Sequence, residues 1–193
     1  MSVDDDRDAV ARCLQGDEGA FAELFRRHEA RAVRLAFGLL GDRGAAEDVK
    51  QEAFLRTFRS LGRMNADVAF TSWLHRHVVW AARTQLRRAH RRHEVTADAT
   101  AVDPGGGQAE LDRHELRTTL VGALQTLTQA SREVVALRFY LDLTEAEIAG
   151  IVGCRRGTVK SRLSRALRQL AASPALADLR DLHPRPEESD HVA

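Results

Sequence analysis

Residues 143–170 read LTEAEIAGIVGCRRGTVKSRLSRALRQL, and this stretch predicts two short helices joined by a tight turn. Thr144 and Glu147 have the T-x-x-E spacing of a capping box, in which each side chain accepts a hydrogen bond from the other residue's backbone N–H. A helix should therefore begin directly after Thr144, and Gly153 should end it. A second helix is expected from about residue 157 to 170, because apolar residues recur there every three or four positions.

The outer face of the second predicted helix is cationic. No acidic residue lies between Gly153 and Leu170. A helix with one apolar seam and a basic outer face can enter the major groove of DNA, but it can also be a solvated helix, a membrane-surface helix or a partner-binding helix. The capping box, the spacing from Ala149 to Gly153 and the run TVKSR at 158–162 together favour DNA. The residues expected on the DNA are Arg155, Arg156, Thr158, Lys160, Ser161, Arg162 and Arg165.

Charge is segregated along the 193 residues, although the formal net charge is only +1. Residues 63–92 contain seven arginines against Asp67 alone, and residues 153–170 are basic again. The N-terminal stub, residues 94–115 and the tail after residue 170 are acidic. Two cationic zones separated by acidic connectors predict two contacts with one polyanion.

Composition argues against several classes of protein. Cys13 and Cys154 are too few for a disulfide framework or a zinc site, and we expect both to be reduced in a cytoplasmic protein. The eight histidines lack the spacing of metal ligands, so no metal or cofactor is expected. No apolar run approaches the roughly 20 residues of a membrane span, and the acidic N-terminus is unlike a signal peptide. Because no catalytic constellation is visible, we expect neither an enzyme nor a small-molecule substrate.

Hydrophobic periodicity predicts an all-α protein: two small helical domains joined by a flexible acidic linker, the C-terminal one containing the helix-turn-helix. Asp4, Asp5 and Asp6 are expected in an unstructured stub. The expected helices are at about residues 6–14, 18–40, 45–61 and 73–92, followed by a Leu116, Leu120, Leu124 and Leu127 stripe and a helix capped by Ser131. The predicted division is 1–17 (acidic stub and short helix), 18–93 (first domain), 94–109 (linker), 110–172 (second domain) and 173–193 (disordered tail).

Periodicity also predicts which side chains are buried. Glu47 and Asp48 should lie in the first turn of the third helix, and Thr71 or Ser72 should cap the fourth. The expected buried residues are Val49, Ala53, Phe54, Phe58, Leu61, Leu74, Val78, Ala81 and Leu86, then Val134, Val135, Leu137, Phe139 and Leu141, and in the last helix Val159, Leu163, Ala166, Leu167 and Leu170. Trp73 is assigned mainly to the core, whereas Trp80 is expected to be exposed among arginines, where it could stack on an unpaired base.

Three segments together resemble a bacterial sigma factor of the extracytoplasmic-function group, the small two-domain kind in the sigma-70 family. The resemblance covers about residues 21–170. The first segment, LLGD at 39–42 with AEDVKQEAFLR at 46–56, is similar to the region that grips the polymerase clamp. The second, FTSWLHR at 70–76 with the basic helix after it, looks like the reader of the −10 element. The third is residues 143–170, which resembles the reader of the −35 element.

The resemblance implies an RNA polymerase sigma factor that directs promoter-specific initiation by binding core polymerase and the −10 and −35 elements. Its implied partners are the clamp of the largest polymerase subunit, the flap of the second largest, promoter DNA and an anti-sigma factor. The implied polymerase-binding residues are Asp48, Gln51, Glu52, Leu55 and Arg56. The implied single-strand (−10) residues are Asn65, Asp67, Phe70, Trp73, Arg76, His77, Trp80, Arg83, Arg87 and Arg88, with the loop 64–71 holding a flipped base.

Four positions depart from the family pattern. Lys50 replaces an apolar residue, Trp80 a frequent Asn, Thr128 a common Pro, and Arg155 the usual Ser or Thr cap, which leaves a backbone N–H in need of another partner. A stand-alone helix-turn-helix regulator is the main alternative, although such proteins usually dimerise and no dimerisation helix is visible. A helical adaptor that binds protein alone is a second alternative.

Overall fold

The structure is a computed structural model that describes residues 3–65, 68–92 and 108–176, and over these residues it contains helices and no strand. The all-α prediction is thereby confirmed. Most of the predicted linker, most of the predicted tail and Asp67 lie outside the described residues. The helices are α1 (Val3–Leu14), α2 (Glu18–Leu40), α3 (Arg43–Ser60), the 3₁₀ helix η1 (Leu61–Arg63), α4 (Phe70–Arg92), α5 (Gln108–Gln125), α6 (Gln129–Leu141), α7 (Glu145–Val152) and α8 (Arg156–Ala171).

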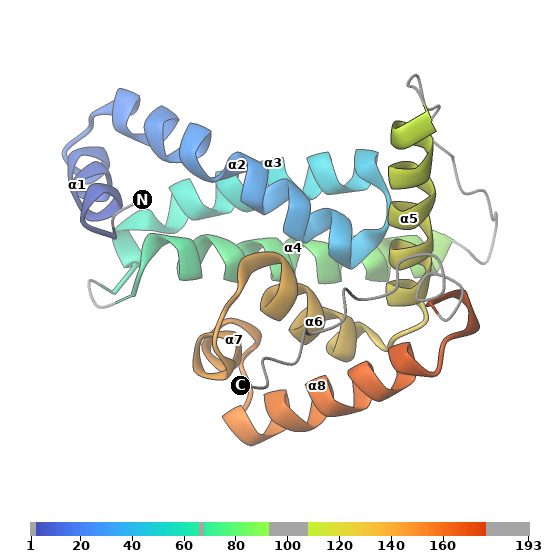
Figure 1. The fold of residues 1–193 in the computed structure, drawn as a ribbon. Helices are drawn as coiled ribbons and strands as arrows, with labels where there is room; N and C mark the ends of the chain where they lie inside the picture. The colour runs from blue at the N-terminus through green and yellow to red at the C-terminus, as the bar shows by residue number, and fades with distance from the viewer. Residues whose placement is uncertain (1–2, 66–67, 93–107, 177–193) are drawn as a thin grey trace, which may run out of the picture.

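Three long helices, α2, α3 and α4, lie side by side, and α1 packs across one end of them (Figure 1). α5 stands at the other end, against α2. α6 packs against α2, and α7 packs against α4, so the C-terminal helices lie directly on the N-terminal ones. α8 covers the outer side of α6 and α7.

Side-chain caps and one glycine define the ends of α2 and the start of α3. Asp17 accepts a hydrogen bond from the N–H of Ala20 at 3.2 Å, and Asp42 accepts one from the N–H of Ala45 at 2.6 Å. Gly41, with φ of 74°, ends α2 in the left-handed conformation that glycine adopts without steric cost. The predicted boundary at 41–42 is confirmed.

Several predicted details of the helix ends are wrong. α3 already begins at Arg43, which places Glu47 and Asp48 beyond its first turn. α4 begins at Phe70, so neither Thr71 nor Ser72 precedes it as a cap. Ser131 lies inside α6, whose cap is Thr128; the Ser131 N–H donates to Thr128 Oγ1 at 3.3 Å. Thr128 stands where the family commonly has proline, and its hydroxyl supplies a capping oxygen that proline lacks.

The N-terminal aspartates are helical, which corrects the prediction of an unstructured stub. α1 begins at Val3 and buries Ala9 and Val10 against α2. Asp6 is 8% exposed because α2 supplies its partners. Its Oδ1 accepts a hydrogen bond from Arg27 at 3.3 Å, and its Oδ2 lies 2.9 Å from His28 Nε2.

The buried apolar residues form one continuous cluster that includes both halves of the chain. Leu24, Leu35 and Leu74 contribute from the N-terminal helices, and Leu137 and Ile148 from the C-terminal ones, all fully buried. The four C-terminal helices therefore do not depend on a small core of their own. They gain buried area by packing on α2 and α4, and buried apolar area is the main source of stability.

Several residues predicted to be buried are not, among them Leu141 and Leu170, which are half-buried. Phe58 is 51% exposed, although its inner edge contacts Phe21 with ring centroids 4.7 Å apart. Leu86 is half-buried. Val121 takes the buried position that was assigned to Leu120, which is 43% exposed. Phe139 and Leu167 are 61% and 44% exposed. Of the two tryptophans, Trp73 is half-buried and donates from Nε1 to Ser60 Oγ at 3.1 Å, whereas Trp80 is exposed as predicted.

His75 should make the stability of this fold depend on pH. Its ring is buried, and neither ring nitrogen has a hydrogen-bond partner among the described residues. Burial, assisted by the nearby His28 and Arg31, lowers the pKa of His75 from 6.5 to about 4. The unfolded chain therefore binds more protons between pH 6.5 and 4, so stability is complete above pH 6.5 and falls as the pH decreases through this window, by about 2 kcal/mol at pH 5.

Replacement of His75 by leucine tests this expectation. The free energy of unfolding in urea is measured at pH 8 and at pH 5, and the difference between the two values should be smaller for H75L than for wild type. His90→Gln is the control, because His90 is exposed, and it should keep the wild-type difference. An equal pH dependence in wild type and H75L would show that groups other than His75 carry it.

Candidate nucleic-acid interface

The helix-turn-helix is built by two local devices that the sequence indicated. Thr144 Oγ1 accepts from the Glu147 N–H at 3.3 Å, and Glu147 Oε2 accepts from the Thr144 N–H at 2.8 Å, which completes the capping box. The Thr144 hydroxyl also donates to Glu147 Oε2, at 2.7 Å, and this bond, with the one from the Thr144 N–H, lowers the pKa of Glu147. Gly153, with φ of 75°, ends α7 and donates to Ala149 O at 3.0 Å. The predicted helix start and turn are both confirmed.

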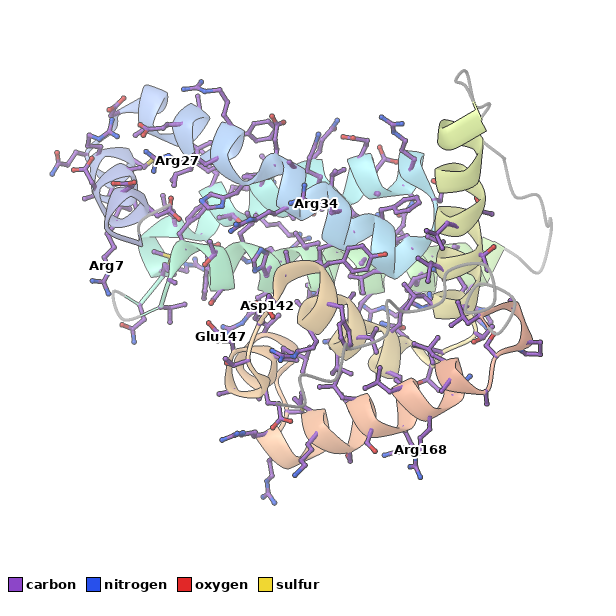
Figure 2. All side chains as sticks on the ribbon, viewed as in Figure 1. Arg7, Arg27, Arg34, Asp142, Glu147 and Arg168 are labelled. Carbon is purple, nitrogen blue, oxygen red and sulfur yellow. The ribbon has the colours of Figure 1, made fainter. Side chains whose placement is uncertain are left out.

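α8 buries one seam and exposes the opposite face. Val159 is fully buried, and Leu163 and Ala166 complete the seam. Arg155, Arg156, Lys160, Ser161 and Arg165 are exposed, whereas Thr158 and Arg162 are half-buried. Farther along α8, Arg168 points away from the molecule (Figure 2). The cationic residues predicted to contact duplex DNA thus lie on one outward-facing helix.

Two details of α8 bear on its partners. Arg155 occupies the cap position without a side-chain hydrogen bond to the helix, as the sequence implied. A helix N-terminus with free N–H groups favours an anion such as phosphate. Arg156 Nε lies 3.2 Å from Glu145 Oε2, an exposed ion pair that costs little to exchange for another anion.

The residues predicted to bind a single strand are spread over different environments. Arg76, Trp80, Arg87 and Arg88 are exposed on α4, while Trp73, His77 and Arg83 are half-buried. Phe70 is 3% exposed and contacts the ring of His28 with centroids 5.4 Å apart, so it belongs to the core. Asn65 is exposed in the loop before α4, and Asp67 lies outside the described residues.

Several of these α4 side chains already have partners within the chain. Thr57 Oγ1 lies 3.0 Å from His77 Nδ1, and the pKa of His77 is lowered, first by burial and then by Arg56 and Arg76. The Arg56 guanidinium lies 3.6 Å from the centroid of the Trp80 ring. Arg76 donates to the carbonyl of Gly150, and Arg83 forms a bidentate pair with Glu133.

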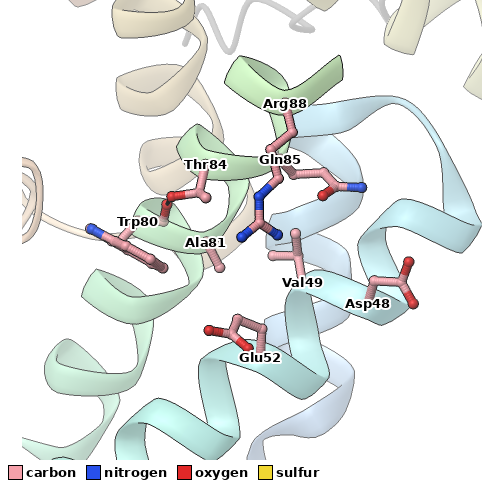
Figure 3. A pocket seen from close by; sticks show the side chains of 8 residues that line it. All are labelled: Asp48, Val49, Glu52, Trp80, Ala81, Thr84, Gln85 and Arg88. Carbon is pink, nitrogen blue, oxygen red and sulfur yellow. Dashed lines mark hydrogen bonds between the residues drawn. The ribbon is translucent and has the colours of Figure 1, made fainter. Parts of the chain in front are cut away.

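The predicted polymerase-binding residues line the outer face of α3. Asp48, Gln51 and Leu55 are exposed, and Glu52 and Arg56 pair with each other. A pocket of about 250 Å³ separates this face from the basic side of α4. Figure 3 shows it lined by Asp48, Val49 and Glu52 from α3, and by Trp80, Ala81, Thr84, Gln85 and Arg88 from α4.

Sequence reasoning missed the residues that join the two halves. Arg132 and Glu133 are both buried, and neither was singled out. The available signal was a charged pair directly before the apolar run 134–137, in a helix that should face the core. Such a pair needs partners inside the protein, because buried charges are costly unless they are paired and hydrogen-bonded.

Comparison with known proteins identifies the family. The model for sigma-70 region 2 matches residues 24–92, and the model for sigma-70, region 4, matches residues 117–170. The ECF RNA polymerase sigma-E factor of Escherichia coli is 32% identical over 173 residues, which cover 83% of this chain and 90% of the relative. The chain belongs to the extracytoplasmic-function sigma factors. This sigma factor directs promoter-specific initiation by RNA polymerase, which the matches favour over a stand-alone helix-turn-helix regulator.

Other relatives agree with this assignment. The sigma factor is 30% identical to the RNA polymerase sigma-H factor of Pseudomonas aeruginosa over 177 residues, covering 86% of this chain and 92% of the relative. It is 35% identical to the ECF sigma factor SigM of Mycobacterium tuberculosis over 166 residues, covering 86% and 83%. Among solved structures, CnrH in complex with the cytosolic domain of CnrY has a TM-score of 0.67 at 26% identity, covering 91% of this chain and 98% of CnrH.

The described part of the sigma factor contains no helix long and apolar enough to cross a membrane. Within the same residues, no group of three or more His, Cys, Asp or Glu side chains could hold a metal ion. Cys13 and Cys154 are both free thiols. Burial raises the pKa of the Cys13 thiol, with a further contribution from Asp17.

Proposed function

We propose that α8 reads the −35 element of promoter DNA in the major groove. The observation that carries this assignment is the exposed cationic face of α8, opposite a seam that is buried against α6 and α7. Arginine pairs bidentately with guanine, so Arg162 and Arg165 are assigned to base edges. Lys160 and the free N-terminus of α8, next to Arg155, are assigned to phosphates.

The −10 element is assigned to the opposite half of the molecule. A pocket of about 480 Å³ lies between α1 and the loop before α4, lined by residues that include Val10, Leu14, Met64, Val68 and Phe70. Its apolar walls suit the face of a flipped base, for which Asn65 and Asp67 remain the proposed readers. Phe70 would form part of the wall rather than a free stacking platform. Trp80, Arg87 and Arg88 would hold the rest of the opened strand.

The polymerase contact is assigned to the α3 face that contains Asp48, Gln51 and Leu55. Phe58 extends this face with an exposed ring, which is the kind of residue that interfaces bury. The clamp of the largest subunit would bind here, and the flap of the second largest would bind the C-terminal helices. We assign the protein to the cytoplasm and give it no catalytic step. The anti-sigma partner implied by the family resemblance is also proposed; the similar protein CnrH was solved in complex with another protein, the cytosolic domain of CnrY.

Run-off transcription with core RNA polymerase on a genomic promoter library tests the proposal. Wild type should produce new start sites that share two upstream motifs. Arg162→Ala should reduce these transcripts about tenfold, because one bidentate base contact contributes about 1–3 kcal/mol. Arg34→Ala is the matched control, since Arg34 is exposed on α2, well away from α8 in Figure 2.

Unchanged transcription by Arg162→Ala would contradict the role given to that side chain. Binding to a palindromic duplex without any need for polymerase would instead support the stand-alone regulator. Transcripts that share the −10 motif but lack a −35 motif would show that α8 does not read sequence.

A further inference from the structure

The first helix forms one wall of the pocket that is assigned to a flipped base. Its lining residues recur at the three- and four-residue spacing of one helix face: Asp6, Arg7, Val10, Ala11 and Leu14. The rest of the described lining comes from η1, the loop after it and the start of α4. Within this lining only Asp6 and Arg7 carry charge. These two α1 residues were not among the predicted DNA-binding residues.

The Asp6 carboxylate is held in place from the side of α2. Its side chain is 11% exposed, its Oδ1 accepts a hydrogen bond from Arg27 at 3.3 Å, and its Oδ2 lies 2.9 Å from His28 Nε2. The His28 ring in turn contacts Phe70, which also lines the pocket. A carboxylate has about four lone-pair sites, so two partners leave it able to accept a further hydrogen bond from a molecule in the pocket.

The bases of DNA differ in what they offer to such a carboxylate. An ionised carboxylate is an acceptor only. Cytosine, adenine and guanine each carry an exocyclic amino group that donates, whereas thymine carries oxygen acceptors and no amino group. A fixed carboxylate in an otherwise apolar pocket would therefore accept from an amino group, and a thymine oxygen would be repelled by it. The mismatch is costly, because a buried charged group that loses a hydrogen-bond partner is not compensated by water.

We infer that Asp6 is a specificity-determining residue of the −10 pocket, which selects a flipped base with an exocyclic amino group and rejects thymine. Arg7 is exposed and projects outward from α1 (Figure 2), so it would bind a phosphate next to the flipped base. A phosphate contact adds affinity without a preference for sequence. The inference rests on the role proposed for this pocket, and it adds to that role a class of base and a reader on α1.

The first test changes the protein, in complex with core RNA polymerase. Sequencing of the run-off transcripts from the genomic library defines the wild-type −10 motif, and one of its positions should be depleted of thymine. Asp6→Asn, whose amide can donate to a thymine oxygen, should accept thymine there about tenfold more often and keep the −35 motif. Arg7→Gln should weaken all promoters alike. Asp8→Asn is the matched control, since Asp8 lies on α1, is exposed and pairs with Arg12 outside the pocket.

The second test changes the DNA and needs no variant that must fold. The base at the discriminating position is replaced in the non-template strand by an analogue without the amino group: zebularine for cytosine, nebularine for adenine or hypoxanthine for guanine. Transcription by wild type should fall about tenfold, whereas Asp6→Asn should lose little. Asp67→Asn is measured in the same way, because Asp67 is the other carboxylate proposed as a reader. Melting followed by circular dichroism establishes that each variant is folded.

The outcomes separate this inference from the proposed function. An equal loss with the analogue in wild type and folded Asp6→Asn would overturn the role of Asp6 and leave the pocket in place. A loss that disappears in Asp67→Asn alone would assign the amino group to the loop and overturn the inference in the same way. A wild-type motif with thymine preferred at every −10 position would also overturn it. The absence of any polymerase-dependent transcript from wild type would overturn the proposed function and, with it, this inference.

Discussion

Replacing Arg132 with methionine should lower the free energy of unfolding by about 3–4 kcal/mol, far more than replacement of an exposed arginine. The Arg132 side chain is buried. It donates at 2.9 to 3.2 Å to the carbonyls of Leu124 and Gln125, at the end of α5, and of Leu127, just after it, and it also donates to the carbonyl of Leu39 in the last turn of α2. Burial lowers the pKa of this guanidinium, but at neutral pH it remains charged.

The physical reason is that one planar cation satisfies the carbonyl ends of two helices. Such ends carry a partial negative charge, and their last carbonyls have no partner within the helix. Methionine fills part of the space and removes the guanidinium donor from these carbonyls, of which Leu124 O keeps the Leu127 N–H at 3.2 Å. Lysine has fewer donors and a different geometry, so Arg132→Lys should recover only part of the loss.

Urea unfolding followed by circular dichroism measures this effect, with exposed Arg165→Ala as the control, which should change stability by less than about 0.5 kcal/mol. A loss below about 1 kcal/mol for Arg132→Met would mean that water reaches the carbonyls and replaces the guanidinium. The unfolding transition should also stay single, because the core is continuous across both halves.

Gly153→Val should disable the helix-turn-helix. Gly153 has φ of 75°, a conformation that a β-branched residue adopts only with strain, and its N–H closes α7 on the carbonyl of Ala149. We expect a loss of about 2–3 kcal/mol in stability. We also expect transcription that depends on the −35 motif to fall by more than about tenfold, because relief of the strain changes the angle at which α8 leaves the turn.

Gly150→Ala provides the comparison. Gly150 lies within α7, and a Cβ there would meet nothing within 4 Å, so alanine should stabilise the helix by roughly 0.5–1 kcal/mol and leave transcription unchanged. Run-off transcription on promoters with and without the −35 motif measures the functional effect. Wild-type transcription by Gly153→Val would show that the turn adapts without moving α8.

Local signals in the sequence predicted the parts of the fold that depend on neighbouring residues. The capping box at Thr144 and Glu147, the breaks at Gly41 and Gly153, and the buried seam of α8 through Val159 are all confirmed. Each depends on backbone hydrogen bonds or on side chains within one or two turns. The run 70–76 and the stretch 143–170 likewise indicated the family, because its motifs are short and continuous in the chain.

Periodicity was less informative about burial. Phe58, Leu120 and Phe139 have helical apolar spacing, yet they are exposed, because spacing identifies an apolar face without stating what covers it. Phe70 was implied as a strand-binding residue by its motif, and the structure places its ring in the core, against His28. The N-terminal segment was predicted to be unstructured, but it forms α1, because Asp6 finds its partners, Arg27 and His28, on α2.

The sequence by itself determined that this chain is helical, where most of its helices end, which helix presents a cationic face, and to which family it belongs. The tertiary structure decided how the halves meet. The pairs Arg83–Glu133 and Arg132–Leu39 join residues 50 and 93 positions apart. No local pattern encodes such a pair, because its geometry depends on the packing of whole helices, and this packing decides which of the predicted DNA-binding residues are free.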